Sequence, residues 1–274
     1  MCQLAWSGDG RVRARTQTGL AVSASGRAWT LLNAAPDLRA QIGGVKSLHP
    51  ASGVRGSPIG AVILTGAEID QTAGLLNLRE RHAFAVFGTA STLAALDANP
   101  MFSALAPDLV QRKVVAVDAT FRLPGGLSAE LFAVPGKVPL YLEKSEASTE
   151  KDTTVGVEIA YDGNKLVFVP AAASITPSLK DRLMRADLVF FDGTLFTDDE
   201  MIACGAGTKT GRRMGHVPID GADGSLARLA GLPGRHIYIH INNTNPILID
   251  GSPERRRVEA AGWEIAADGL EVTL

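Results

Sequence analysis

The sequence lacks several features that would assign it to a specialised class of protein. Two cysteines among 274 residues are too few for a disulfide framework and favour a reducing compartment. No apolar run approaches the ~20 residues of a membrane span, and the N-terminal stretch lacks the apolar segment of a signal peptide. The formal net charge of -2 supplies no basic field for nucleic acid or an anionic membrane. We therefore expect a cytoplasmic protein with no membrane span and no nucleic-acid partner.

The composition that remains is globular, with 46% hydrophobic and 20% charged residues, and the length suits one large domain or two small ones. Apolar runs predict strands along the whole chain, and turn residues at Ala24–Arg27 and Asp162–Asn164 predict two hairpins. The expected strands are Gly19–Ser23, Trp29–Asn33, Ile59–Thr65, Ala83–Phe87, Val114–Val117, Leu127–Val134, Val155–Tyr161, Lys165–Val169, Leu188–Phe191, His236–Ile241 and Leu270–Leu274.

Helical periodicity lies between these runs and sets the expected fold class. Early strands are linked by hairpins, whereas later ones alternate with helices. This order predicts an α/β protein with stacked sheets and helices outside, a four-layer αββα sandwich. The polar stretch Glu143–Thr154 is expected to be a surface loop. The expected helices are Asp70–Arg81, Thr89–Asp97, Pro177–Arg185, Ser225–Leu232 and Ser252–Ala261.

The segment Arg235–Pro246 is the most informative feature of the chain. Residues Ile237–Ile241 alternate as a strand does, and the polar run Asn242–Asn245 with Pro246 follows directly. This change places His240 at the end of a core strand, where ligand and catalytic groups collect. The alternative, a histidine satisfied within the core, is set aside only if other segments supply partners.

Three further strand ends also deliver polar residues: Gly66–Gln71, Asp192–Thr194 and Met214–His216. Each has a structural alternative. Asp70 suits the first turn of a helix, Asp192 an Asx turn, and His216 a loop histidine bonded to backbone. The acidic run Asp198–Glu200 is expected to be the solvated first turn of a short helix.

The combination is more informative than any single member. Two histidines and two aspartates at strand ends are the ligand types of zinc or non-haem iron. A set of Asp70, His216 and His240 would form a two-histidine, one-carboxylate site with open positions for water, oxygen or substrate. Because these residues come from distant segments, their spacing does not establish the site.

Several of these segments are similar to the pyrroloquinoline quinone (PQQ) biosynthesis protein B family, within the metallo-β-lactamase superfamily. The resemblance covers essentially the whole chain and implies one metallo-β-lactamase-like domain over residues 1–274. It also implies a metal site between two sheets. The matching segments are Arg15–Gln17, Asn33–Asp37, Ile63–Leu76, Phe191–Thr194, Met214–His216 and Ile239–Pro246.

The resemblance implies a role in making the redox cofactor PQQ from a precursor peptide. The implied reaction is an iron-dependent hydroxylation of the tyrosine of that peptide, with zinc as the alternative metal. His240 and Asp70 would bind the metal, together with His216 or Gln71. Asp192 would be a bridging carboxylate or a partner of the ligands, and Asn242 would orient ligands or donate a hydrogen bond to a substrate oxygen.

The chain departs from the family pattern in three places. Relatives begin with a strand and a Cys-x-Cys-x-x-Cys cluster that binds structural zinc, whereas this chain starts at the last of these cysteines, Cys2. A zinc held by Cys2 is therefore not expected, since structural zinc needs about four ligands, and we expect a truncated start. Gln71 replaces a histidine of many relatives and is a weaker ligand. Thr153–Thr154 replaces a Gly-His pair.

Two other functions stay open at the level of sequence. A metallo-hydrolase would be the commonest chemistry of the superfamily, but only two of the five histidines lie in credible positions. A carrier of PQQ or its precursor to the periplasm is the second alternative, favoured by Gln71 and the missing N-terminal strand. The expected partner is the precursor peptide or a later pathway intermediate, and a homodimer is a further expectation.

Overall fold

The computed structural model describes residues 1–51, 53, 56–142 and 152–274. The chain divides into two compact units, and each is described by itself. The first unit comprises residues 1–15, 134–137 and 164–274, and the second comprises residues 16–133 and 138–163. Most of the predicted surface loop Glu143–Thr154 lies outside the described residues.

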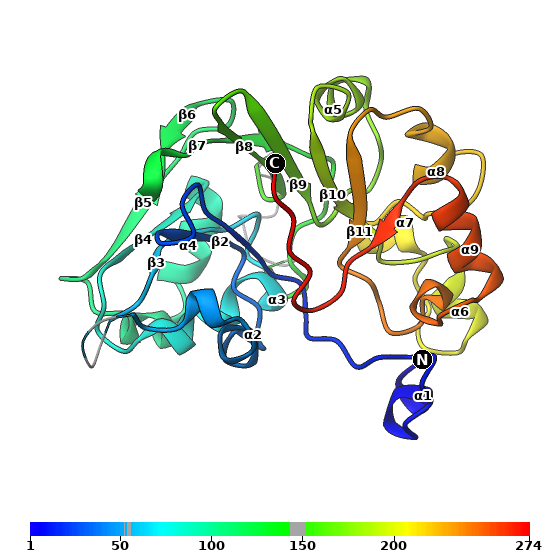
Figure 1. The fold of residues 1–274 in the computed structure, drawn as a ribbon, viewed down its shortest axis with the longest axis horizontal. Helices are drawn as coiled ribbons and strands as arrows, with labels where there is room; N and C mark the ends of the chain where they lie inside the picture. Colours follow the sequence, from blue (N-terminus) through cyan, green and yellow to red (C-terminus); the bar gives the residue numbers. More distant parts are fainter. Residues whose placement is uncertain (52, 54–55, 143–151) are drawn as a thin grey trace. The chain divides into compact units, whose positions relative to one another are not determined.

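The second unit contains a five-stranded sheet in the order β1-β2-β3-β4-β5 (Figure 1). The strands β1 and β2 form the predicted hairpin and pair antiparallel, whereas β2 to β5 pair parallel. One face of this sheet packs its buried Val62, Leu64 and Val86 against Leu75 and Leu93 of the helical segments. The bounds are β1 (Leu20–Val22), β2 (Trp29–Leu32), β3 (Ile59–Ile63), β4 (Phe84–Gly88) and β5 (Val110–Val114).

Short helices follow these strands in the second unit. Thr89 begins α4 as its N-cap, with its side-chain oxygen accepting the backbone N–H of Thr92. The α-helices are α2 (Leu38–Gly44), α3 (Ile69–Thr72) and α4 (Ala90–Asp97), and the 3₁₀ helices are η1 (Lys46–Leu48), η2 (Ala73–Leu78), η3 (Pro100–Ala104), η4 (Pro124–Gly126) and η5 (Leu140–Leu142).

Three antiparallel strands complete the second unit: β6 (Thr120–Arg122), β7 (Ser128–Ala133) and β8 (Val155–Tyr161). Phe132 of β7 lies opposite Gly156 of β8. A Cβ atom at Gly156 would overlap the ring of Phe132. The ring occupies the space that a side chain would need, so glycine is the residue that fits at this position.

The first unit contains four strands that pair parallel in the order β9, β10, β11, β12 (Figure 1). Helices occupy each connection between them, as the alternation in the sequence predicts. The strands are β9 (Asn164–Val169), β10 (Leu188–Asp192), β11 (Arg235–Ile239) and β12 (Glu264–Ile265), and the helices are α1 (Cys2–Trp6), α5 (Pro177–Leu183), α6 (Glu200–Ala203), α7 (Gly211–Met214), α8 (Ser225–Arg228), η7 (Pro246–Leu248) and α9 (Pro253–Ala260).

The core of the first unit is centred on β10 and β11. Tyr238 is fully buried and stacks on Trp263 with ring centroids 4.1 Å apart, while Phe191 meets the same indole edge-on. The hydroxyls of Tyr238 and Ser225 are 2.8 Å apart, and burial raises the pKa of Tyr238 far above its usual range. The phenol therefore stays protonated and holds β11 against α8.

Three predictions about elements are wrong. The strand predicted at Val114–Val117 ends rather than begins at Val114, because the alternation of exposed Gln111 and Lys113 marks an edge strand of mixed polarity. Leu270–Leu274 is not a strand, and both leucines are exposed. The helix predicted at Asp70–Arg81 is one α-helical turn followed by η2, since Gly74 packs so closely on Ala34 and Ala35 that a Cβ atom would overlap their backbone.

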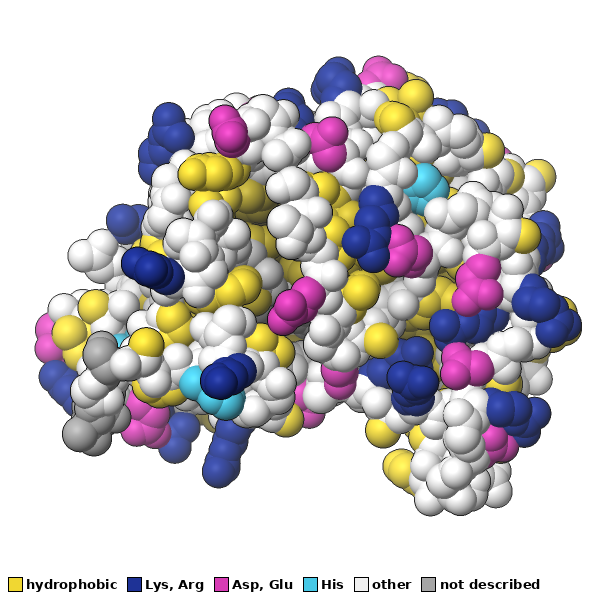
Figure 2. Space-filling view, in the orientation of Figure 1, with side chains coloured by type: hydrophobic (Ala, Val, Ile, Leu, Met, Phe, Trp, Pro, Cys, Tyr) yellow, Lys and Arg dark blue, Asp and Glu magenta, His cyan; other side chains and the backbone are white. Residues whose placement is uncertain are grey.

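Both signs of charge are present on the surface. Figure 2 shows Lys and Arg interspersed with Asp and Glu on the face that it displays, in keeping with the net charge of -2. Among the described residues, no helix combines the length and the apolar character that crossing a membrane requires.

Candidate metal centre

The carboxyl ends of β10 and β11 bring two predicted site segments together. Asp192, the last residue of β10, lies in register with Ile239, the last residue of β11, because the two strands are parallel. His240 follows with a φ of 58°, a left-handed conformation that turns the chain out of the sheet. Gly193 donates its N–H to the carbonyl of Ile239 at 2.8 Å, and a Cβ there would lie 2.9 Å from that of Tyr238.

His216 reaches the same place from the end of α7. Gly215 has a φ of 92° and ends that helix, as left-handed glycines commonly do. His216 donates its own N–H back to the carbonyl of Gly211 at 2.9 Å, which fixes the turn. Its ring stacks on that of His240, with centroids 5.2 Å apart and an interplanar angle of 20°.

Ligand atoms of Asp192, His216 and His240 all lie within 4.8 Å of one another. Asp192 is fully buried, and the side chain of His216 is 14% exposed. Within the described part of the chain this is the group of histidine, cysteine or carboxylate residues that could hold a metal ion, and Cys2 is not a member of it. The structure thus brings together three of the residues singled out from the sequence.

The carboxylate of Asp192 accepts four hydrogen bonds. The backbone N–H of Thr194, at 3.1 Å, and its hydroxyl, at 2.6 Å, bind Oδ1. The N–H of Ala172, at 3.1 Å, and Nδ1 of His216, at 2.8 Å, bind Oδ2. A carboxylate offers about four lone-pair sites, so each is matched by a donor, and a metal ion at this carboxylate would have to replace one of them.

Counting protons at Thr194 assigns the tautomers of both histidines. Its Oγ1 lies 2.6 Å from Asp192 Oδ1, 2.7 Å from His240 Nδ1 and 3.0 Å from His216 Nδ1. The hydroxyl has one proton, and its shortest contact, with an oxygen of the Asp192 carboxylate, is where that proton is donated. Both Nδ1 atoms must therefore be donors, which leaves the lone pair of each neutral ring on Nε2.

This arrangement fits a divalent metal ion. Imidazole Nε2 is a common ligand for zinc and iron, and a histidine that donates its other N–H to a carboxylate or a hydroxyl is held in orientation and made more basic. Thr194 supports both rings at once by accepting from each Nδ1–H. The carboxylate of Asp192, which is fully buried, adds negative charge next to the ring of His216.

The asparagines after His240 hold the loop to β10. The side chain of Asn245 is fully buried and donates to the carbonyl of Gly193 at 2.9 Å, while its own oxygen accepts the N–H of Ile247 at 3.0 Å. The backbone N–H of Asn242 donates to the carbonyl of Thr194 at 3.0 Å. These bonds fix the position of His240 relative to Asp192 and Thr194.

The prediction that Glu200 is a solvated residue is wrong. Its side chain is 8% exposed, and its carboxylate accepts the N–H of Phe196 at 2.7 Å and the hydroxyl of Thr244 at 2.5 Å. Burial raises the pKa of this carboxyl, against the lowering effect of these hydrogen bonds. Neither Glu200 nor Thr194 is singled out as functional by sequence. Thr194 has no sequence signal of its own, whereas Glu200 is followed directly by the apolar run Met201–Ala203.

Asp70 and Gln71 belong to the second unit, where both lie in α3. Gln71 and Glu68 form a capping box, in which Oε1 of Gln71 accepts the N–H of Glu68 at 3.2 Å. Gln71 is buried, and a Cβ at Gly66 would lie 2.7 Å from its Oε1. The amide therefore has a structural role, and the assignment of Asp70 and Gln71 as metal ligands stays a prediction.

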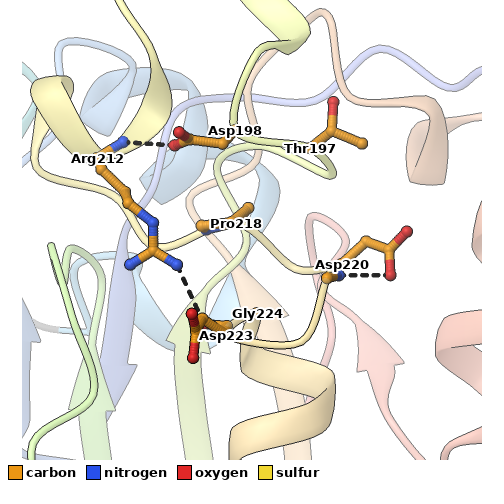
Figure 3. Close-up of a pocket in the computed structure, with 8 residues that line it drawn as sticks. Thr197, Asp198, Arg212, Pro218, Asp220, Asp223 and Gly224 are labelled. Atoms are coloured by element: carbon orange, nitrogen blue, oxygen red, sulfur yellow. Dashed lines mark hydrogen bonds between the residues drawn. The ribbon is translucent and has the colours of Figure 1, made fainter.

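A surface pocket of about 300 Å³ lies beside α7 (Figure 3). Arg212 crosses it, with its backbone N–H donating to Asp198 at 2.9 Å and its guanidinium donating to the carbonyl of Asp223 at 3.3 Å. Asp220 also lines it, but none of the three candidate metal-binding side chains does. The pocket is therefore distinct from the metal centre.

The chain is similar to one group of proteins over its full length. Residues 28–241 match the β-lactamase superfamily domain. The chain is 51% identical to coenzyme PQQ synthesis protein B of Methylobacterium sp. (strain 4-46), covering 100% of this chain and 92% of that protein. The crystal structure of Zn²⁺-bound PqqB from Methylobacterium extorquens superposes with a TM-score of 0.96 at 50% identity, covering 100% and 92%.

A more distant likeness supports the fold alone. The metallo-β-lactamase fold protein YhfI from Bacillus subtilis superposes with a TM-score of 0.66 at 14% identity, covering 93% of this chain and 91% of that one. The expected metallo-β-lactamase fold class is confirmed. The prediction of a single domain over residues 1–274 stays a prediction.

Proposed function

Because the chain belongs to the coenzyme PQQ synthesis protein B family and so has a role in PQQ biosynthesis, we propose that it hydroxylates a tyrosine of the PQQ precursor peptide with a metal ion. The observation that carries this proposal is the pair of histidines whose Nδ1 atoms both donate to the Thr194 and Asp192 cluster. The two Nε2 lone pairs are then the ligand atoms.

His216 and His240 would hold the ion, with Asp192 as the carboxylate that orients His216 and supplies negative charge. Iron bound there would supply the redox chemistry of hydroxylation, in which one atom of O2 enters the ring, the other leaves as water and an external reductant gives two electrons; zinc has no redox chemistry. Thr194 keeps both rings in one tautomer, and Asn245 keeps the loop of His240 in place. Asp70 is proposed as a further ligand, which metal analysis of an Asp70→Asn variant tests.

Two imidazoles do not favour the hydrolytic alternative. Hydrolases that activate a metal-bound water commonly use three or more protein ligands, several of them histidine. The crystal structure of PqqB from Methylobacterium extorquens is a Zn²⁺-bound one, and an imidazole and carboxylate set accepts zinc as well as iron. The presence of zinc in a relative therefore does not decide the reaction of this chain.

The test is anaerobic reconstitution with ferrous iron, followed by oxygen, a two-electron reductant such as ascorbate, and a peptide that contains tyrosine. We expect a mass gain of one oxygen atom, no gain in a peptide with phenylalanine at that position, and none with the His240→Ala variant. Cleavage of a phosphodiester by the zinc-loaded protein would favour the hydrolase instead. Tight PQQ binding by metal-free protein, unchanged in His240→Ala, would favour a carrier.

A further inference from the structure

A chain of side-chain hydrogen bonds runs from the loop after His240 to α6. Asn242 Nδ2 donates to Thr244 Oγ1 at 2.7 Å, and Thr244 Oγ1 donates to Glu200 Oε1 at 2.5 Å. Glu200 is 8% exposed, so the far end of the chain is buried. None of these three side chains is a candidate ligand, and the proposed reaction assigns no role to Glu200 or Thr244.

The direction of this chain is set at Glu200. Its Oε2 accepts the backbone N–H of Phe196 at 2.7 Å, and the N–H of Thr197 also donates to the carboxylate. The separation of 2.5 Å between Thr244 Oγ1 and Oε1 is that of a hydroxyl donating to a carboxylate oxygen. Thr244 must then give its single proton to Oε1, and its oxygen can only accept from Asn242.

This count of protons orients the amide of Asn242. Its two Nδ2 hydrogens face Thr244 Oγ1 and the thioether of Met201, whose Sδ is 3.2 Å away and only accepts. Within the described part of the chain, no donor bonds to its Oδ1. Asn242 is partly exposed and lies two residues beyond His240, with its backbone bonded to Thr194.

We propose that Glu200 is a positioning residue that acts through Thr244, so that Asn242 presents its carbonyl oxygen, a hydrogen-bond acceptor, to the substrate. This inference rests on the proposed function, because the ligand it selects is a molecule with an O–H or N–H donor, such as a phenol. It reverses the sequence-based expectation that Asn242 donates to a substrate oxygen. A substrate group that can only accept hydrogen bonds would be repelled by the carbonyl oxygen of Asn242, so such substrates would bind more weakly.

The substitution Glu200→Gln reverses the chain while keeping the shape of the side chain. The N–H groups of Phe196 and Thr197 still require an oxygen, so the new amide turns its NH₂ to Thr244. Thr244 must then give its proton to Asn242, whose amide flips and presents NH₂ outward. Thr244→Val removes the hydroxyl that links Asn242 to Glu200. The control is Glu271→Gln, which makes the same chemical change at an exposed residue.

Side-chain amide NMR of the zinc-loaded protein reads the orientation directly, with the Asn242 signal identified by its loss in Asn242→Asp. We expect the Nδ2 protons to exchange with water about tenfold faster in Glu200→Gln and Thr244→Val, as the loss of hydrogen bonds implies. Glu271→Gln should match the parent protein. Equal exchange in Glu200→Gln and the parent protein would overturn the positioning role.

Binding of N-acetyl-tyrosinamide and N-acetyl-phenylalaninamide to the same zinc-loaded proteins tests the acceptor. The parent protein should prefer the phenol by about five- to tenfold, and Glu200→Gln should lose that preference with unchanged affinity for the phenylalanine compound. A parent protein without the preference would overturn the acceptor assignment. Because neither measurement needs turnover, failure of tyrosine hydroxylation would appear separately, in the oxygen-dependent assay.

Discussion

At the scale of single residues, Thr194 organises the metal centre with one hydroxyl. It contacts Asp192, His216 and His240, and its proton decides which nitrogen of each ring can ligate a metal ion. Here the count of its one donor and two acceptors is what selects Nε2 on both rings.

Substitution of Thr194 should therefore weaken metal binding. Thr194→Val keeps the shape but removes the acceptor for both Nδ1–H groups, and we expect zinc affinity to fall about 10- to 100-fold, the usual effect of losing such a partner. Competition with a chromophoric chelator measures this loss. Thr194→Ser, which keeps the hydroxyl, should stay close to the parent protein, and equal affinities for all three proteins would contradict the role.

The residues of the centre differ in how well the sequence predicts them. His240, His216 and Asp192 are predictable because each stands where an apolar run or a glycine turn gives way to polar residues. Thr194 is not, since a hydroxyl that orients a ring has no spacing of its own in the chain. Glu200 was expected in solvent because an acidic run at a helix start usually is, whereas two backbone N–H groups bring it inside.

At the scale of elements, the capping box of α3 allows the two roles considered for Gln71, a helix cap and a metal ligand, to be distinguished. Gln71→Ala removes the reciprocal bond with Glu68, and we expect a loss of about 0.5–2 kcal/mol in the free energy of unfolding. Metal stoichiometry should not change if the amide is only a cap. Chemical denaturation gives the first quantity and elemental analysis the second.

The matched variant for this prediction is Gln71→Glu, because glutamate also serves in a capping box. It should retain most of the stability lost in Gln71→Ala. A fall in bound metal in Gln71→Ala that Gln71→Glu does not share would show instead that Gln71 is a ligand, because a carboxylate binds a divalent ion at least as well as an amide.

Packing between β7 and β8 gives a second prediction at this scale. Gly156→Ala would push a methyl group into the ring of Phe132, and overpacking of this kind costs about 1–3 kcal/mol. We expect the melting temperature to fall, and the double variant Gly156→Ala with Phe132→Leu to lose less than the two single effects combined. Strict additivity in thermal denaturation would contradict the contact.

The elements themselves are mostly predictable, for physical reasons visible in their strands. The parallel strands β10 and β11 lie within two residues of their predicted bounds, because each contains a buried apolar run. The helices α4 and α9 follow the N-caps Thr89 and Ser252, which are the predicted first residues of these helices. Edge strands are less predictable. β5 carries Gln111, Arg112 and Lys113, and β12 has only two residues, so neither has the apolar pattern of a buried strand.

At the scale of the whole molecule, metal binding should stabilise the protein by mass action. Zinc at about one hundred times its dissociation constant would add about 2.7 kcal/mol to the free energy of unfolding. We expect a chelator to lower the melting temperature of the parent protein and to leave that of His240→Ala unchanged. Calorimetry at several zinc concentrations measures both, and a zinc response retained by His240→Ala would contradict the site.

Glu200 should leave a signature in the pH dependence of stability. Burial raises its pKa in the folded protein above the usual 4.5. A raised pKa contributes stability that is fully present below 4.5 and is lost as the pH rises through the folded value. The free energy of unfolding of the parent protein, relative to that of Glu200→Gln, should therefore be higher at pH 4 than at pH 8, as measured by urea denaturation. An equal difference in this free energy at both pH values would contradict the burial effect.

The saturated carboxylate of Asp192 has a practical consequence for anyone who isolates the protein. Because both rings already donate to Thr194 or Asp192, and fixed donors hold the carboxylate, the site requires little rearrangement for the two Nε2 atoms to capture an ion from its surroundings. Along the Irving–Williams order, nitrogen and oxygen donors bind zinc more tightly than ferrous iron. Cells grown in rich medium would thus yield zinc-filled protein whichever ion the reaction uses, and iron supplementation during expression should change what is purified.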